Sequence, residues 1–222
     1  MDLQLLINRT NVRGESSSSL SENFCKPNKC SVFRLGVLVS GSGTNLQAIM
    51  NACRNKRVPA KVIIVISNKK DALALQRAKK YNIKSGFIDP KKYNFDKKVI
   101  EILEKQKVDL VCLAGFLLKL SKKFIKKYRN RILNIHPALL PKFGGKRMYG
   151  INVHKAVLEA GEKNSGCTVH LVDERYDHGK IILQKKVKVL KNDTPETLQK
   201  RVLKQEHKIY PEAIKLFIKR CL

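Results

Sequence analysis

The sequence has no apolar run long enough to cross a membrane. A membrane-spanning helix needs about 20 consecutive apolar residues. The longest candidate, Val108 to Leu118, is about half that length and is better interpreted as a buried strand with its following turn. We therefore expect no association with a membrane.

Aromatic and acidic residues are both scarce. Tryptophan is absent, and aromatic residues make up 6% of the chain. The chain has 46 Lys and Arg but only 18 Asp and Glu, which gives a formal net charge of +28. Such a chain could bind nucleic acid, attract small anionic substrates, or simply carry Lys on solvated faces. The basic residues are spread along the whole chain, and no aromatic-rich RNA-binding strand occurs. We favour composition bias first, anion attraction second, and expect no nucleic-acid partner.

The six cysteines form no C-x-x-C pair, and no Cys/His set has zinc spacing. Cys112 lies inside an apolar run, where a free thiol behaves as a small hydrophobic residue. The pattern indicates a reducing compartment, no disulfide framework and no metal.

Residues 1–31 differ from the rest of the chain. They contain the run Ser16 to Ser19 and have no sustained hydrophobic periodicity. The segment is interpreted either as a disordered tail or as a transit peptide, because plastid transit peptides are rich in Ser and poor in acidic residues. Its three acidic residues make that match imperfect. We expect the folded domain to span residues 32–222.

From Phe33 onward, apolar strand-like runs alternate with helical patterns. The expected strands are residues 34–39, 61–66, 85–88, 108–114 and 131–135, and the expected helices are residues 44–54, 71–81, 95–106 and 121–128. Fully apolar strands separated by helices predict an α/β fold with a mainly parallel, twisted sheet covered by helices on both faces. This architecture is Rossmann-like.

The C-terminal third has a different pattern. A helix is expected over residues 152–160, closed by Gly161. Residues 167–172 and 181–189 read as strands of a more antiparallel arrangement. A last helix is expected from about residue 193, where Asp193 or Thr194 can cap it, to about residue 219.

A glycine-rich turn, Ser40-Gly41-Ser42-Gly43-Thr44-Asn45-Leu46, joins the first strand to the first helix. Backbone N–H groups in such a turn can surround an anion, and the start of a helix favours negative charge. Leu46 stands where a dinucleotide-binding turn needs its third glycine, and no Walker A sequence is present. A single phosphate monoester is the ligand that fits best. The alternative is a tight turn without a ligand.

Asn134 and His136 end a predicted strand and are followed by Pro137. Side chains at the carboxyl ends of parallel strands line the binding crevice. Alternation directs Asn134 and His136 to the same side. An Asn amide can stabilise an oxyanion and a His can transfer a proton near neutral pH, so the pair suits acyl transfer. The alternative is an ordinary hydrogen-bonded histidine at a polar strand end.

The segment Val172 to Gly179 joins the two C-terminal strands and contains Asp173 and Asp177. A carboxylate near His136 would raise the pKa of the imidazole and orient the ring. The residues alone leave open which of the two aspartates faces His136, and a simple hairpin turn is the other interpretation.

Six segments, taken in order, closely resemble the phosphoribosylglycinamide formyltransferase family. They read SGSGTNLQAI, VISNK, DLVCLAGFLLKLS, RILNIHPALLPKF, GCTVHLVDERYDHGKIILQ and RVLKQEHKIYP. The resemblance extends over about residues 34–217 and is specific, because all six motifs keep their order and approximate spacing.

The resemblance implies transfer of a formyl group from 10-formyltetrahydrofolate to the amine of glycinamide ribonucleotide, in purine biosynthesis. It implies an enzyme that acts on small molecules and requires no metal. The sequence leaves open whether the protein is a monomer or a homodimer. The residues that match the family's sites are, for catalysis, Asn134, His136 and Asp177; for the phosphorylated substrate, Gly43, Thr44, Asn45, Leu203, Lys204, Gln205 and Glu206; and for the folate, Lys92, Leu117, Leu118, Lys119, Leu120, Asn134 and Asp173.

Formyltetrahydrofolate deformylase and methionyl-tRNA formyltransferase share the Asn-x-His-Pro site. The turn at residues 43–45 and the segment at residues 205–206 favour a small phosphorylated substrate over either. Residues 144–152 are longer than in compact bacterial members and resemble plant forms. This loop and the Ser-rich tail suggest the plastid (chloroplast) stroma, with the cytoplasm as the alternative.

Overall fold

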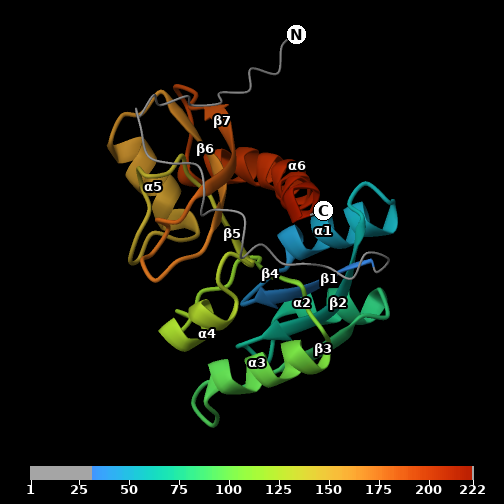
Figure 1. The fold of residues 1–222 in the computed structure, drawn as a ribbon. Coiled ribbons are helices and arrows are strands. Elements are labelled where there is room, and N and C mark those ends of the chain that lie inside the picture. Colours follow the sequence, from blue (N-terminus) through green and yellow to red (C-terminus); the bar gives the residue numbers. More distant parts are fainter. Residues whose placement is uncertain (1–31, 222) are drawn as a thin grey trace, which may run out of the picture.

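The computed structural model describes residues 32–221, so the interpretation of residues 1–31 lies outside the described residues. Seven strands form one sheet in the order β3-β2-β1-β4-β5-β6-β7 (Figure 1). The strands are β1 (Phe33–Val39), β2 (Ala60–Ser67), β3 (Lys84–Phe87), β4 (Leu110–Leu113), β5 (Ile132–His136), β6 (Asn164–Leu171) and β7 (Ile181–Lys188). The helices of the described chain are α1 (Thr44–Arg54), α2 (Leu73–Lys80), α3 (Phe95–Lys105), α4 (Lys122–Lys127), α5 (Ile151–Glu159) and α6 (Pro195–Cys221).

The sheet is parallel from β1 to β5 and antiparallel where β6 and β7 are added. The predicted α/β class and the antiparallel C-terminal part are confirmed. The central strand β4 is buried at every position, which explains its unbroken apolar sequence.

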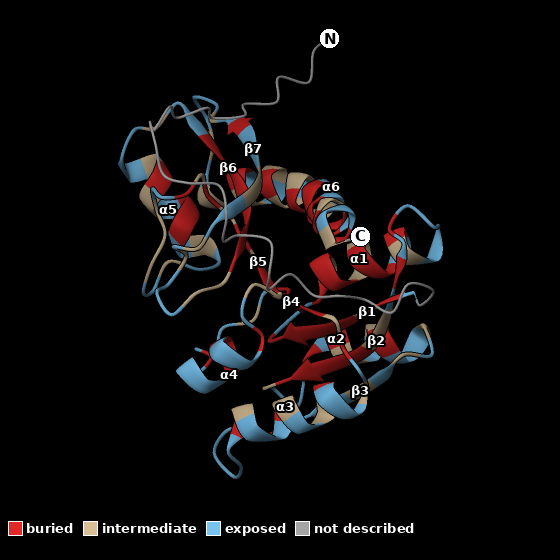
Figure 2. Cartoon of the chain, viewed as in Figure 1, coloured by how far each residue is buried: buried red, intermediate tan, exposed pale blue. Residues whose placement is uncertain are grey.

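Two hydrophobic clusters show that helices cover both faces of the sheet. One cluster joins α1, α2, α5 and α6 to the sheet, and the other joins α3 and α4 to it. Neighbouring residues of β1 divide between them, because Val37 belongs to the first cluster and Leu38 to the second. Figure 2 shows the buried residues gathered on the strands and on the inner sides of the helices.

Local sequence features explain several boundaries. The Ser121 Oγ accepts a hydrogen bond from the Phe124 N–H at 3.2 Å, so Ser121 caps α4 as expected. Gly36 gives α3 room to pack on β1, because a Cβ there would lie 2.6 Å from Leu103 Cδ2. The helix α2 begins at Leu73, two residues later than Asp71, where the sequence pattern begins it.

The order of the strands indicates which edge of the sheet binds ligands. Strand β1 lies between β2 and β4, so the connections that follow β1 and β4 leave in opposite directions along the sheet. In parallel α/β sheets, ligands bind at this switch point, beyond the carboxyl ends of the strands. The glycine-rich turn follows β1 there, and Asn134 and His136 end β5 at the same edge.

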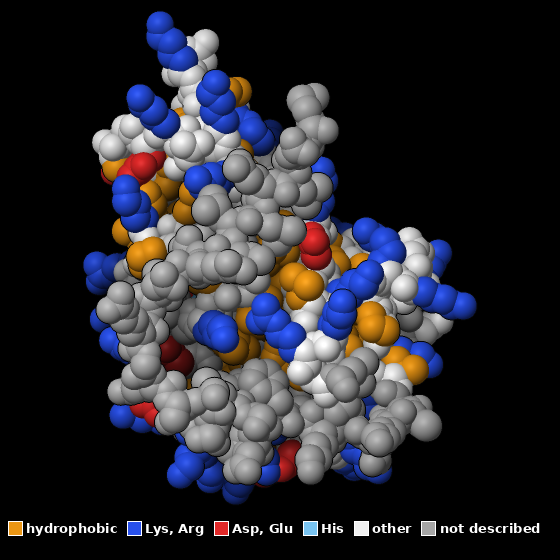
Figure 3. Space-filling view, turned by 45° about the horizontal axis from the view of Figure 1, so that its top comes forward, with side chains coloured by type: hydrophobic (Ala, Val, Ile, Leu, Met, Phe, Trp, Pro, Cys, Tyr) orange, Lys and Arg blue, Asp and Glu red, His pale blue; other side chains and the backbone are white. Residues whose placement is uncertain are grey.

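Two surface properties bear on partners. Within residues 32–221, no helix is both long enough and apolar enough to cross a bilayer. Lys and Arg side chains are scattered over the face shown in Figure 3, with few acidic side chains between them. This scatter is consistent with composition bias.

Candidate active site

A cavity of about 600 Å³ opens at the carboxyl ends of β1, β4 and β5. Segments far apart in the sequence meet around it. They are residues 41–45, 114–117, 134–137 and 145–150, together with His154, Tyr176, Asp177, Gln199, Leu203 and Glu206. The cavity therefore brings together the glycine-rich turn, the end of β5 and the aspartate loop.

The glycine-rich turn forms one end of the cavity. Gly43 has a φ of 71°, in the left-handed region that favours glycine. A Cβ at this position would lie 2.6 Å from Ala74 Cβ, so α2 also packs closely against the turn. Helix α1 begins at Thr44, directly after this glycine, and its first N–H groups are available to an anion.

Asn45 and Glu206 form a buried pair next to the turn. Asn45 Nδ2 donates a hydrogen bond to Glu206 Oε2 at 2.6 Å. Burial raises the pKa of Glu206 above its ordinary value, while the hydrogen bond from Asn45 acts in the opposite direction. A carboxyl group in this setting can accept a hydrogen bond from a ligand amide or amine.

His136 is 3% exposed and has an acceptor at each ring nitrogen. Its Nε2 lies 2.8 Å from the Phe143 carbonyl oxygen, and its Nδ1 lies 3.5 Å from Asp177 Oδ2. Burial lowers the pKa of His136, and Asp177 and the Phe143 carbonyl partly offset that shift. The Phe143 carbonyl can only accept, so neutral His136 carries its proton on Nε2 and presents an unprotonated Nδ1.

Asp177 is the aspartate that faces His136. Burial alone would raise its pKa, but contacts with His170, His136 and the Gly145 N–H outweigh burial and leave the pKa below its ordinary value. Asp173 turns instead to His178, whose Nδ1 lies 2.7 Å from its Oδ2. Geometry thus separates two aspartates that the pattern of residues did not.

Asn134 lies between Asp177 and a histidine of β6. Its Nδ2 lies 3.1 Å from His170 Nε2 and 3.4 Å from Asp177 Oδ1. His170 Nδ1 lies 2.8 Å from the Leu171 carbonyl oxygen, so the ring is held at both nitrogens. This pairing fixes the orientation of the amide. The longer contact, with Asp177, is the one that an incoming oxygen can replace.

A second cavity, of about 110 Å³, adjoins the first. Its wall is mostly apolar by area, and its lining residues come mainly from the segment after β4 and from residues 172–177. The predicted folate residues Leu117, Leu118, Lys119, Leu120, Asn134 and Asp173 all line it. Asn134 and Asp177 line both cavities, so the two spaces meet at these side chains.

Three residues that the resemblance assigns to the site line neither cavity. Lys92 is exposed in the turn after β3, where its N–H donates to the Asp89 carbonyl at 3.2 Å. Lys204 is exposed on α6, and Gln205 is half-buried beside it. Lys204 and Gln205 point away from the cavity because of the helical period. Leu203 and Glu206, three positions apart on one face of α6, line it instead.

The sequence patterns missed His154, His170 and the loop at residues 145–150. His154 is 1% exposed and lines the main cavity from α5, and burial lowers its pKa to about 4, with His136 adding to the shift. His170 had a weak signal, because Thr168 and His170 alternate with apolar residues along β6. The loop supplies two cations to the cavity, Lys146 and Arg147.

Metal chemistry has no candidate site in the described part of the chain. Among residues 32–221, no group of three or more His, Cys, Asp or Glu side chains is arranged to hold a metal ion.

The formyl transferase family model matches residues 33–214. The chain is 42% identical over 188 residues to phosphoribosylglycinamide formyltransferase of Haemophilus influenzae, covering 83% of this chain and 86% of that protein. The chain belongs to the phosphoribosylglycinamide formyltransferase family. The resemblance seen in the six sequence motifs is confirmed.

Two further comparisons support this family membership. The chloroplastic phosphoribosylglycinamide formyltransferase of Arabidopsis thaliana is 44% identical over 186 residues, which is 82% of this chain. The chain spans 64% of that relative's length, just under two thirds. The crystal structure of glycinamide ribonucleotide transformylase 1 from Symbiobacterium toebii superposes with a TM-score of 0.80 at 47% identity, covering 85% of this chain and 88% of that one.

Proposed function

We propose that the protein transfers the formyl group of 10-formyltetrahydrofolate to the amine of 5'-phosphoribosylglycinamide, a step of purine biosynthesis. The observation that carries the proposal is the meeting of two cavities at Asn134 and Asp177, beside His136. One cavity ends at an anion-binding turn and the other is largely apolar. The pair suits a phosphorylated acceptor and a pterin-bearing donor whose reacting atoms meet at these side chains.

The phosphorylated substrate fits the main cavity in one direction. Its phosphate lies at the N–H groups of Gly43, Thr44 and Asn45. Its glycinamide end then reaches toward Asn134 and His136, past Glu206, which lines the same cavity. Glu206 accepts a hydrogen bond from the glycinamide. Lys146 and Arg147 add positive charge at the rim of this cavity.

The transfer is direct, without a covalent enzyme intermediate. The amine nitrogen attacks the formyl carbon, and the carbonyl oxygen gains negative charge. Asn134 Nδ2 donates to that oxygen in place of its 3.4 Å contact with Asp177. His136 Nδ1 accepts the proton that the amine loses and donates it to the folate nitrogen as the bond from this nitrogen to the formyl carbon breaks. Asp177 stabilises His136 while the ring carries the extra proton.

An assay of formyl transfer tests the proposal. The full chain is supplied with 10-formyltetrahydrofolate, with and without glycinamide ribonucleotide, and both formylated product and released tetrahydrofolate are measured. We expect both to appear only with the nucleotide. Release of tetrahydrofolate without the nucleotide would indicate a deformylase, with water as the acceptor. No reaction in either case would overturn the proposal.

His136→Ala is the matched variant for that assay. It removes the group that carries the proton, and general acid–base catalysis contributes about 10²- to 10⁴-fold to rates. We expect a loss in that range with folding retained, as measured by thermal melting. Turnover close to that of the unaltered protein would contradict the proposed role of His136.

Residues 32–222 are proposed as the formyltransferase domain and residues 1–31 as a plastid transit peptide, which places the enzyme in the plastid stroma. The support is the Ser-rich composition of the first segment and the chloroplastic name of the Arabidopsis relative. Mass spectrometry of the protein isolated from its source tests this. A mature chain that retains Met1 or the Ser16 to Ser19 run would favour the cytoplasm.

A further inference from the structure

Three successive carbonyl groups of the glycine-rich turn, those of residues 41–43, accept hydrogen bonds from groups that do not line the cavity. The Gly41 carbonyl accepts from the Ala74 N–H at 3.1 Å, and the Gly43 carbonyl accepts from the Gln47 N–H at 2.9 Å. The Ser42 carbonyl, between them, accepts from Arg77 Nε at 2.8 Å. In a trans peptide, the carbonyl and the next N–H point in opposite directions. Holding these carbonyls back therefore turns the following N–H groups toward the cavity.

Arg77 is the only side chain among these three donors. The other two donors are backbone N–H groups of α2 and α1. Arg77 lies on α2, half-buried, and its Nη1 also approaches Gln47 Oε1 at 3.3 Å. Gln47 in turn donates from Nε2 to the Tyr81 hydroxyl at 2.6 Å. The guanidinium thus joins α2, α1 and the turn, which its planar, multi-donor shape suits.

Arg77 also carries charge to this end of the cavity. A guanidinium remains protonated at all relevant pH values. Its charge also acts on α6. Burial lowers the pKa of His207 on that helix, and the charge of Arg77 lowers it further. The two cations that line the cavity, Lys146 and Arg147, come from the loop after β5 rather than from the turn. Arg77 is therefore a fixed positive charge directly behind the turn.

We propose that Arg77 is a positioning residue for the substrate phosphate: it fixes the Ser42 peptide so that the Gly43 N–H faces the phosphate, and it places a positive charge behind it. Arg77 does not touch the reacting atoms. The inference rests on the proposed function, because it assigns the turn to the phosphate of the formyl acceptor. Replacing Arg77 should therefore impair transfer only to an acceptor that carries the phosphate.

The test compares two acceptors, glycinamide ribonucleotide and glycinamide riboside, which lacks the phosphate. With Arg77→Ala, we expect kcat/KM for the ribonucleotide to fall by about 10-fold or more, the loss expected for one charge-assisted hydrogen bond. The loss should appear mainly in KM for the ribonucleotide. The KM for 10-formyltetrahydrofolate and kcat/KM for the riboside should change by less than about twofold, because neither involves the phosphate.

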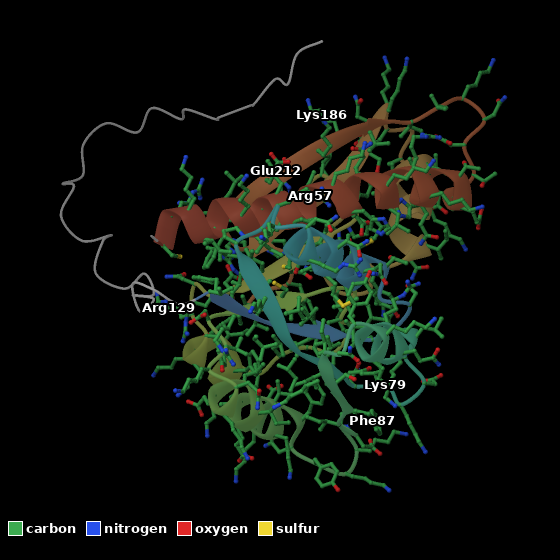
Figure 4. The ribbon with its side chains drawn as sticks, turned by 90° about the vertical axis from the view of Figure 1, so that its right-hand side faces the viewer. Arg57, Lys79, Phe87, Arg129, Lys186 and Glu212 are labelled. Atoms are coloured by element: carbon green, nitrogen blue, oxygen red, sulfur yellow. The ribbon has the colours of Figure 1, made fainter. Side chains whose placement is uncertain are left out.

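Lys79→Ala is the matched control, since Lys79 is exposed on the same helix and is labelled in Figure 4. It removes the same charge without a bond to the turn and should leave every kinetic constant unchanged. Arg77→Lys keeps the charge but offers a different donor geometry, so it should lie between Arg77→Ala and the unaltered protein.

An equal loss on both acceptors, or no loss on either, would overturn the assignment of Arg77. If Arg77→Ala does not fold, the same comparison with Arg77→Lys decides, because a structural role alone would not separate the two acceptors. Failure of the unaltered protein to transfer a formyl group to the ribonucleotide would instead overturn the proposed function, so the two failures are distinguishable.

Discussion

The backbone N–H of Gly145 donates a hydrogen bond to the Asp177 carboxylate at 2.9 Å. In the same segment, residues 143–150, the Phe143 carbonyl oxygen lies 2.8 Å from His136 Nε2. One loop therefore holds both members of the histidine–aspartate pair, and it also carries Lys146 and Arg147 into the main cavity. Its glycines allow this path, because Gly145 and Gly150 both have positive φ angles.

Asp177→Asn should lower turnover by about 100-fold or more, because the amide no longer stabilises protonated His136. The pH profile should change as well. Burial lowers the pKa of His136 and Asp177 opposes that shift, so loss of the carboxylate lowers the pKa further. Neutral His136 then persists to lower pH, and the pH at which kcat/KM falls on the acid side should shift to a lower value. An unmoved limb, measured from pH 4 to 8 in ~0.5-unit steps, would argue that another group titrates.

Glu206→Gln should raise KM for the ribonucleotide by about 10-fold and leave KM for the folate unchanged. The carboxylate accepts from Asn45, and the Gln side chain can present an amide that competes with this contact. Steady-state kinetics with each substrate varied in turn measures the effect. Glu212→Gln is the control, because Glu212 is exposed on the same helix (Figure 4). Equal changes in the two variants would exclude a specific role for Glu206.

Gly43→Ala should both destabilise the protein and weaken binding of the ribonucleotide. The left-handed φ of 71° costs a residue with a Cβ about 1 kcal/mol, and contact with Ala74 adds to that cost. Denaturant unfolding measures the first effect and KM the second. Gly86→Ala is the control, since a Cβ there meets nothing within 4 Å. A Gly43→Ala protein with unchanged stability and KM would show that the turn is more adaptable than its geometry indicates.

The double variant Lys146→Ala/Arg147→Ala should raise KM for the ribonucleotide and weaken its dependence on salt. These two cations line the main cavity and not the apolar one, so KM for the folate should stay constant. Titration of KM against ionic strength separates this from a structural effect, because attraction between charges falls as salt rises. Lys186→Ala, on the exposed edge strand β7 (Figure 4), should leave both constants unchanged. A flat salt response in the unaltered protein would contradict the proposed charge effect.

The sequence by itself determined the order of strands and helices. Apolar runs such as that of β4 and helical periods such as that of α3 are local signals, and the structure confirms the elements that they predict. Alternation along β5 was also sufficient to put Asn134 and His136 on one side of the strand, and both line the main cavity. The glycine-rich turn was recognisable because left-handed backbone favours glycine.

Only the tertiary structure decided which side chains meet those of β5. Asp173 and Asp177 lie in one short turn, and their separation depends on how that turn folds back on the Phe143 to Gly150 loop. His170 reaches Asn134 because β6 pairs antiparallel with β5, a contact between residues 36 positions apart. Arg77 reaches the glycine-rich turn because α2 packs against Gly43. Periodicity reports the neighbours along one element, whereas these contacts join separate elements and follow from the packing of the whole chain.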